Sequence, residues 1–146
     1  MAFDPGCVFC QILAGQAAAS FVAQTPTVAA FMDINPVTPG HLLVVAKDHF
    51  VGLDDTPPEV MVEIAQMGQR CAAALRKSQF RSEGINLFLA DGAAAFQEVF
   101  HVHLHVIPRY RGDGFRIGVD RGSRPNRGEL DSAATALQEL LPPSSR

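Results

Sequence analysis

FHVHLHVIP, at residues 100–108, alternates histidine with apolar side chains at every step up to Val106. Strict alternation is typical of a β-strand, because successive side chains point to opposite faces of a sheet. His101, His103 and His105 are therefore expected on one face, with neighbouring Cα atoms roughly 6.6 to 7 Å apart. The intervening apolar side chains face the other way and can pack on a core.

Other segments of the chain also have the pattern of short strands. They are apolar or β-branched, they have strand length, and turn residues such as Pro and Gly separate them. Pro26 divides the first of these stretches, which predicts two short strands or one interrupted strand. The expected strands are residues 21–25, 27–32, 41–47, 84–90 and 100–108.

One long helix is expected between these strands. It begins at Thr56, where Thr-Pro-Pro-Glu predicts an N-cap hydroxyl, proline at the first helical position and Glu59 at the third. Apolar residues then recur at steps of three and four up to about Ser78, which gives a single apolar stripe.

Two shorter helices are expected near the ends of the chain. Residues 7–14 precede Gly15, a usual residue just after a helix, and Asn126 with Glu129 resembles an N-terminal capping pair. Residues 112–125 are expected to form a loop. The sequence therefore predicts one α+β domain over residues 1–146, with a mainly antiparallel sheet, one long packed helix and short N- and C-terminal helices.

Composition excludes several classes of function. The chain has 146 residues, 47% of them hydrophobic, and a net charge of −3 without a basic block. Duplex nucleic-acid-binding proteins normally carry a basic stripe, so we expect no nucleic-acid partner. No apolar run approaches the roughly 20 residues of a membrane-spanning helix, and residues 1–5 lack the features of a signal peptide. We therefore expect a cytoplasmic protein that does not associate with membranes.

Three histidines on one strand face allow two kinds of chemistry. Histidines two residues apart on a strand can converge on one zinc ion. Alternatively, neutral imidazole is a good nucleophile near pH 7, because its reference pKa is about 6.5. Spacing alone does not separate these two possibilities.

The match to a known pattern extends beyond the histidine strand. Four other segments and QEVFHVHLHVIPR at residues 97–109 follow one another in a fixed order. This pattern closely resembles the histidine triad nucleotide-binding family, whose members are hydrolases or transferases acting on nucleoside monophosphates joined to a leaving group. The other matching segments are CVFCQI (7–12), FMDINP (31–36), PGHLLV (39–44) and Asp91-Gly92.

This resemblance implies roles for individual residues. His103, the middle histidine of the motif, would be the nucleophile, and His105 would hydrogen-bond the phosphate or the leaving group. His41 would either support the triad or simply begin a strand. The other implied contacts are Gln97 and the backbone amide of Val99 with phosphate oxygens, Asp33 with the ribose hydroxyls, and Phe9, Phe31 and Ile34 with a purine base.

Two positions depart from the family pattern. Ala90 stands where many members have Asn or Gln, and Phe96 stands where glycine is common. The first change removes an amide that could bind a ligand. The second places a phenyl ring beside the phosphate-binding loop, so both changes bear on which leaving group is accepted.

Cys7 and Cys10 form a Cys-x-x-Cys pair with no second pair in the chain. A tetrahedral zinc site would therefore need ligands of another type, and His49 and His101 are candidates that complete a Cys2His2 set. Bacterial-type members of the triad family use the matching positions in this way. We expect a structural zinc ion at these four residues and no organic cofactor.

The sequence thus predicts an enzyme that cleaves the α-phosphate linkage of adenylylated compounds, such as phosphoramidates or dinucleoside polyphosphates, through a nucleotidyl-histidine at His103. Two alternatives stay open. One is a metal-dependent enzyme in which the triad itself holds a catalytic ion, and the other is a nucleotide-sensing adaptor with vestigial activity. A homodimer is expected, because family members commonly form dimers and the long helix offers a suitable surface.

Overall fold

The computed structural model describes residues 2–120 and 122–141 of the chain. These residues form two compact units, Met1–Phe115 and Arg116–Arg146, each of which is described separately. The single domain that we expected over residues 1–146 stays a prediction.

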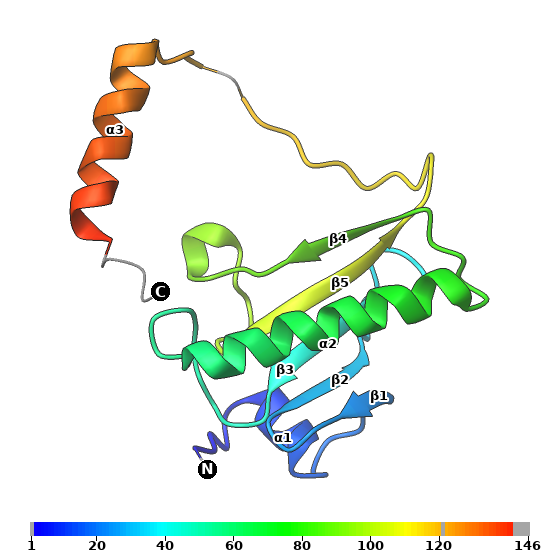
Figure 1. Ribbon diagram of the computed structural model, residues 1–146. Coiled ribbons are helices and arrows are strands. Elements are labelled where there is room, and N and C mark those ends of the chain that lie inside the picture. The colour runs from blue at the N-terminus through cyan, green and yellow to red at the C-terminus, as the bar shows by residue number, and fades with distance from the viewer. Residues whose placement is uncertain (1, 121, 142–146) are drawn as a thin grey trace. The chain divides into compact units, whose positions relative to one another are not determined.

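The first unit is built on a five-stranded antiparallel sheet with strand order β1-β2-β3-β5-β4 (Figure 1). The expected strands are all present, and Pro26 separates two strands rather than interrupting one. This confirms the α+β class with a mainly antiparallel sheet. The strands are β1 (Phe21–Gln24), β2 (Val28–Met32), β3 (Leu42–Ala46), β4 (Gly84–Phe88) and β5 (His103–Arg109).

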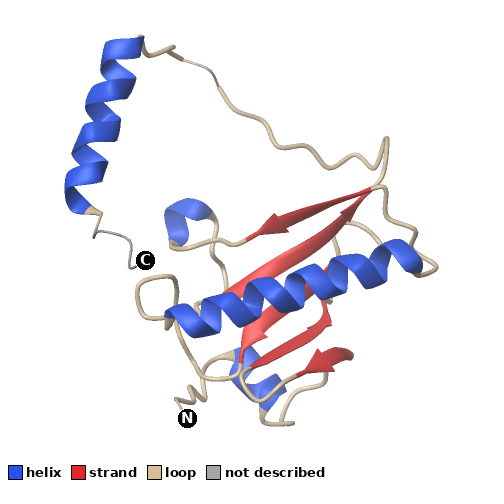
Figure 2. Ribbon diagram, in the orientation of Figure 1, coloured by secondary structure: helices blue, strands red, loops and turns tan. Residues whose placement is uncertain are grey.

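A helix covers each face of this sheet, so alternate residues of the central strands enter two different cores (Figure 2). Helix α2 (Pro58–Lys77) packs on one face, where Val44 and Leu104 meet Ile64 and Met67. The short helix α1 (Val8–Leu13) packs on the other face. The second core consists of Cys7, Phe9, Cys10, Ile12, Ala29, Phe31, Leu43 and Val45.

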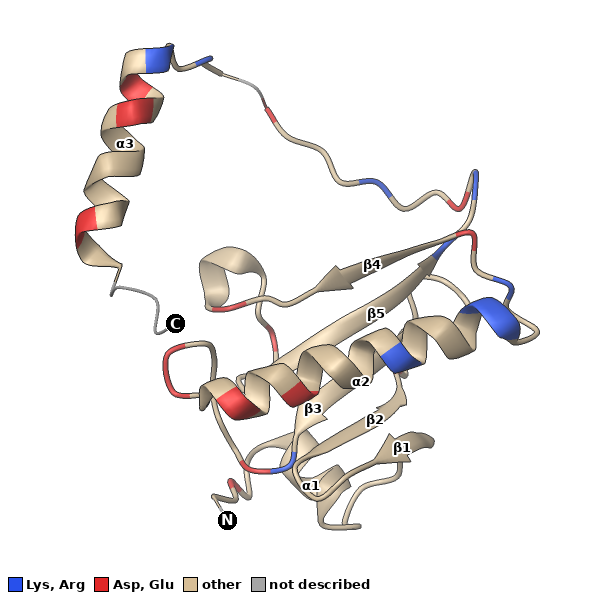
Figure 3. Cartoon of the chain, in the orientation of Figure 1, with Lys and Arg blue, Asp and Glu red and all other residues tan. Residues whose placement is uncertain are grey.

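Helix α2 has the predicted length but not the predicted N-cap. Pro57 occupies the N-cap position without a side-chain cap, and the Thr56 hydroxyl donates to the Gly52 carbonyl at 2.5 Å. The Thr56 cap was therefore a wrong prediction, because this hydroxyl instead closes the preceding turn. Acidic residues lie in the first half of α2 and basic residues toward its end, as Figure 3 shows, which suits the helix dipole. Gly68 lets α2 approach β5, since a Cβ there would lie 2.7 Å from the Leu104 Cδ2.

Strand β5 begins at His103, three residues later than the sequence pattern indicated. Pairing with β3 reaches only as far as Val45 opposite His103, so His101 lies before the strand. The expectation that all three histidines belong to one strand was wrong for His101. His103 and His105 do share a face, because they are paired with Val45 and Leu43 of the second core.

The second unit consists of an extended segment followed by α3 (Arg127–Leu140). The predicted capping pair is confirmed: the Asn126 side chain accepts from the Glu129 N–H at 2.9 Å, and the Glu129 carboxylate accepts from the Asn126 N–H at 2.7 Å. The helix is therefore specified locally, although none of its described side chains is buried.

Candidate active site and metal centre

His103 has one ring nitrogen tied to the backbone. Its Nδ1 lies 2.6 Å from the carbonyl oxygen of His101, and a carbonyl can only accept, so Nδ1 carries the proton. In the neutral ring, Nε2 then holds an unshared electron pair. Phe9 of α1 packs edge-on against this ring with centroids 5.1 Å apart, and His103 is only 5% exposed. The tautomer of the His103 ring and the orientation of that ring are therefore both fixed.

Burial favours the neutral form of this ring. It lowers the pKa of His103 below its ordinary value, and the hydrogen bond to His101 opposes the shift only in part. A neutral imidazole with a free Nε2 lone pair is the reactive form of a histidine nucleophile.

A chain of hydrogen bonds fixes the proton of His105. The Val37 N–H donates to the His41 Nδ1 at 3.0 Å, so the proton of neutral His41 lies on Nε2. That Nε2 lies 2.9 Å from the His105 Nδ1, which must then accept. The proton of neutral His105 consequently lies on Nε2, and this ring can donate a hydrogen bond. His41 supports the triad through this contact, which resolves its role between the two alternatives.

His105 also resists acquiring a charge. Burial lowers its pKa to about 4, and the neighbouring rings of His103 and His41 act in the same direction. Asp33 opposes the shift, and its Oδ2 lies 3.5 Å from the His41 Nε2. His105 is therefore a neutral hydrogen-bond donor at physiological pH.

The two cysteines and two histidines predicted as zinc ligands meet at one point. Their four ligand atoms, one from each of Cys7, Cys10, His49 and His101, all lie within 4.8 Å of one another. The His101 Nδ1 lies 3.4 Å from the Cys7 Sγ, 3.6 Å from the Cys10 Sγ and 3.2 Å from the His49 Nδ1. The His49 Nδ1 lies 3.4 Å from the Cys10 Sγ.

These separations fit a tetrahedral metal site. Zinc bonds of about 2.3 Å to sulfur and about 2.0–2.1 Å to nitrogen place tetrahedral ligands about 3.6 Å apart for a sulfur–nitrogen pair and about 3.3 Å apart for two nitrogens. The His101 Nε2 lies 2.7 Å from the Ala46 carbonyl and must donate to it, which leaves the Nδ1 lone pair directed at the cluster. The donor set and its spacing therefore suit a metal with four protein ligands.

The three triad histidines do not converge on one ion. The Nδ1 of His101 faces the cysteines, that of His103 faces a carbonyl and that of His105 faces His41. Among the described residues, neither group of side chains that could hold a metal includes His103. This geometry disfavours a catalytic ion held by the triad.

Comparison with known proteins identifies the family of the chain. The model of the HIT domain matches residues 14–112, which is more than half of the chain. The chain belongs to the HIT family. An uncharacterised HIT-like protein of Mycobacterium tuberculosis is 43% identical over 137 residues, covering 92% of each chain. A zinc-bound histidine triad family protein of Mycobacterium smegmatis is 41% identical, with a TM-score of 0.74 and coverage of 93% of this chain and 98% of that chain.

A further relative has a named activity. The adenylylsulfatase of Arabidopsis thaliana is 35% identical over 131 residues, which cover 90% of this chain and 65% of the plant protein. HIT proteins are generally nucleotide hydrolases or transferases. No described helix of this HIT protein is long and apolar enough to cross a membrane.

The side-chain amide of Gln97, which was expected to contact a phosphate oxygen, is already bonded to the backbone. Its Oε1 accepts from the Gly92 N–H at 2.8 Å, and its Nε2 lies 2.7 Å from the Val51 carbonyl and 3.2 Å from that of Val99. The side chain thus braces the loop. The Val99 amide, in contrast, donates to no group of the described chain, so it is available to a ligand.

The residues expected around the nucleoside are only partly gathered. Phe9 and Phe31 are buried and meet edge-on at 5.6 Å, and Asp33 lies at the end of β2 beside His41. Ile34 is 91% exposed and does not join this cluster. Phe21 of β1, which the sequence analysis did not single out, packs on Phe31 at 5.8 Å. The sequence around Phe21 indicates only a strand and does not predict this contact with Phe31.

The two departures from the HIT pattern have different surroundings. Ala90 is buried, whereas Phe96 is 81% exposed and has a φ of 69°. A left-handed backbone is the conformation in which glycine is favoured. The backbone conformation at this position therefore favours glycine. Phe96 adopts it at the cost of backbone strain, and its side chain is not buried in return.

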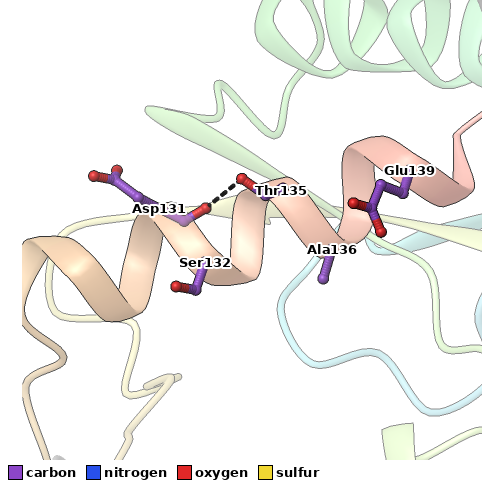
Figure 4. Close-up of a pocket in the computed structure, with 5 residues that line it drawn as sticks. All are labelled: Asp131, Ser132, Thr135, Ala136 and Glu139. Atoms are coloured by element: carbon purple, nitrogen blue, oxygen red, sulfur yellow. Dashed lines mark hydrogen bonds between the residues drawn. The ribbon is translucent and has the colours of Figure 1, made fainter.

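Helix α3 has a shallow depression, which is lined by one helix face alone (Figure 4). The Thr135 hydroxyl donates to the Asp131 carbonyl at 3.0 Å within it. It contains no histidine or cysteine, and we assign no function to it. The lining residues are Asp131, Ser132, Thr135, Ala136 and Glu139.

Proposed function

We propose that this HIT protein is a nucleotidyl hydrolase or transferase that cleaves the α-phosphate linkage of adenylylated substrates through a nucleotidyl-histidine at His103. The observation that carries the proposal is the hydrogen bond from the His103 Nδ1 to the His101 carbonyl, at 2.6 Å. This bond leaves the Nε2 lone pair of a neutral, buried ring as the group that reacts.

The first step is an in-line displacement at phosphorus. The His103 Nε2 forms a bond to the α-phosphorus while the bond from phosphorus to the leaving group breaks. The ring becomes cationic during attack, and the His101 carbonyl on Nδ1–H stabilises that charge. The free Val99 amide is suited to bind an equatorial phosphate oxygen, where phosphoryl-type transition states collect charge.

His105 supplies the proton that the leaving group needs. Its Nε2–H is directed outward because His41 occupies the Nδ1. A leaving amine or oxyanion takes this proton as it departs, and water returns the proton when it attacks the nucleotidyl-histidine. In that second step the bond between phosphorus and the His103 Nε2 breaks, which releases the nucleoside monophosphate.

One relative and the aromatic cluster support the proposed substrate class. Phe9 and Phe31 are suited to contact a purine, and the Asp33 carboxylate is suited to the ribose hydroxyls. The expected contacts of Ile34 with the base and of Gln97 with a phosphate oxygen are left out of this proposal, because Ile34 is exposed and both the side-chain amide and the N–H of Gln97 are bonded to the chain. The plant relative named an adenylylsulfatase supports adenylylated compounds as the general class, and phosphoramidates and dinucleoside polyphosphates belong to it.

Cys7, Cys10, His49 and His101 would hold a zinc ion, as their spacing and the name of the zinc-bound relative support. Four protein ligands close the coordination sphere, so the metal would be structural.

We also propose a homodimer. Strand β4 forms an edge of the sheet, and its Leu87 side chain is 51% exposed. In the described chain, this edge strand has no partner on its outer side, and an exposed edge with apolar side chains favours pairing with another chain. A sedimentation measurement that finds only monomers at micromolar concentration would contradict this.

The test is a turnover assay on adenosine 5′-phosphoramidates and diadenosine polyphosphates. Wild type is expected to release AMP, and His103→Ala is expected to lose at least about 10³-fold in kcat, because the covalent route is removed. His103→Asn, with AMP affinity and circular dichroism measured in parallel, controls for folding. Full activity of His103→Ala would refute the mechanism. Binding of AMP without any turnover by wild type would favour the adaptor instead.

A further inference from the structure

We propose that the cluster of Cys7, Cys10, His49 and His101, when it holds a metal ion, positions the nucleophile and one wall of the nucleoside pocket. This inference rests on the proposed function of His103. The cluster would then contribute to catalysis as well as stabilise the fold. Two separate sets of contacts connect it to the ring of His103.

The first set of contacts runs through the main chain of His101. Its Nδ1 faces the cluster, whereas its carbonyl oxygen accepts the proton of the His103 Nδ1. The same residue therefore serves as ligand and as the acceptor that orients the nucleophile.

The position of that carbonyl is not set by the sheet. The pairing of β3 with β5 ends at Val45 and His103, so His101 lies outside the ladder. His101 is held by its ring, which is fully buried between the Ala46 carbonyl and the cluster, and by its N–H, which donates to the Val99 carbonyl. The peptide group that contains its carbonyl is also held by the Val102 N–H, which donates to the carbonyl of Phe50, the residue after the cluster residue His49, at 2.7 Å. A metal on the Nδ1 would fix the ring at both nitrogens and the carbonyl with it.

The second set of contacts runs through α1. This helix has only six residues and no side-chain cap, so it has little stability of its own. Cys7 precedes it and Cys10 lies within it, and both face the cluster. Phe9, between them, packs on the His103 ring at 5.1 Å and on Phe31 at 5.6 Å. Fixing the two cysteines therefore fixes the aromatic wall that contacts both nucleophile and proposed base.

Few polar contacts could replace the metal in holding α1. The Gln11 side chain bonds to Pro5 and the Asp4 N–H to the Cys10 Sγ, and both bonds stay within the N-terminal segment. The His49 N–H donates to the Ala2 carbonyl at 2.9 Å and does reach across. Besides apolar packing, this bond and the 3.9 Å ion pair of Asp4 with His49, the contacts of the described chain that join α1 to the sheet are those of the cluster.

His49 is the residue with which to test this, because its side chain contacts the cluster and Asp4 but neither His103 nor Phe9. His49→Ala removes one ligand. His49→Cys restores a four-ligand set of the Cys3His type, which also binds zinc. Cys71→Ser, a buried cysteine of α2 outside the cluster, is the matched control.

Three quantities besides activity are measured: zinc content, the dissociation constant for AMP, and the NMR signal of the His103 Nδ1–H. In His49→Ala we expect zinc to be lost, AMP binding to weaken several-fold, and the Nδ1–H signal to be lost through faster exchange with water. The kcat should fall about 10- to 100-fold, as for other groups that orient a site through a metal ligand. His49→Cys should regain most of the zinc, AMP affinity, Nδ1–H signal and kcat that His49→Ala loses, whereas Cys71→Ser, outside the cluster, should match wild type in all four respects.

A folded, zinc-free His49→Ala protein with unchanged AMP affinity and Nδ1–H signal would overturn the inference. If that variant does not fold, wild type is prepared with cadmium in place of zinc. The larger ion should shift the NMR signal of the His103 Nδ1–H. An unchanged signal would also overturn the inference. Absence of turnover by wild type would refute the proposed function alone, since the zinc, AMP and NMR measurements would still decide the positioning.

Discussion

Two clusters of this HIT domain each combine two histidines with other possible metal ligands, but they differ in where the histidine protons lie. In the Cys7/Cys10/His49/His101 cluster, the His101 Nε2 donates to a carbonyl and its Nδ1 lone pair faces two thiols. In the cluster of Asp33, His41 and His105, the His41 Nδ1 lone pair is already used by the Val37 N–H.

The difference decides what each cluster can bind. The first leaves lone pairs converging on one point, which is what a metal requires. In the second, the His41 Nε2 carries a proton that is shared with His105. A metal on that Nε2 would move the proton to the His41 Nδ1 and so break the hydrogen bond from the Val37 N–H. Distance alone groups both sets as possible metal sites. The assignment of hydrogen-bond donors and acceptors distinguishes them: the first cluster can bind a metal, whereas the second orients His105 as a proton donor.

Metal content should show the largest difference between the clusters. We expect wild type to bind one zinc ion per chain, Cys10→Ser to bind almost none and Asp33→Asn still to bind one. Structural zinc sites in small peptides contribute about 10–16 kcal/mol, so losing one ligand should be evident by elemental analysis after dialysis. If wild type bound two zinc ions per chain and Asp33→Asn lost the second, the conclusion that only the first cluster binds a metal would be wrong.

His41→Phe should affect catalysis while leaving the metal in place. We expect kcat to fall roughly 100-fold, at the lower end of what a positioned proton donor contributes, because the His105 Nδ1 loses its partner. The pKa of His105 should rise as well, since His41 is one of the groups that lower it. Steady-state assays and an NMR titration measure the two effects. Loss of zinc from this variant would mean that the clusters are not independent.

Stability should depend on pH through His105. Its pKa is about 4 in the folded protein and about 6.5 in an unfolded chain, so the unfolded state binds more protons between these values. The free energy of unfolding should therefore fall as pH decreases from 6.5 to 4, with a slope of at most about 1.4 kcal/mol per pH unit from this group. Urea unfolding at pH 7 and pH 5 should show a larger loss for wild type than for His105→Gln. Equal losses would contradict the assignment.

Phe96→Gly should have the smallest effect, since residue 96 lies outside both clusters. Glycine relieves the left-handed φ of 69° and loses little burial, so unfolding should become harder by up to about 1 kcal/mol. Chemical denaturation measures this, and zinc content should not change. A destabilised variant would show that the exposed ring makes contacts in solution.

The sequence was most informative where one residue pattern has one structural consequence. The alternation at residues 100–108 and the capping pair of Asn126 and Glu129 both predicted real elements. The cluster that could hold a metal was anticipated because a Cys-x-x-Cys pair without a companion needs other ligands, and the family resemblance pointed to His49 and His101. Their geometry, in contrast, depends on strand β5 beginning only at His103, which leaves His101 free to turn toward the cysteines.

Other features depend on contacts between distant segments and leave no local trace. Nothing in the sequence around Gln97 shows that its amide braces Val51, which lies 46 residues away. The link of His41 to His105 spans 64 residues, and it became visible only when β3 and β5 were paired. The cap predicted at Thr56 failed for a different, local reason: its hydroxyl donates to the Gly52 carbonyl, four residues earlier, rather than to the helix.

The central claim is that the His103 Nε2 bonds covalently to phosphorus. The most direct test is mass spectrometry of protein quenched in alkali during single turnover of an adenylylated substrate, followed by peptide mapping. The mechanism predicts an AMP adduct on His103 that forms and decays at the rate of turnover, and that is missing from His103→Asn. Turnover without an adduct, or an adduct on another residue, would contradict it.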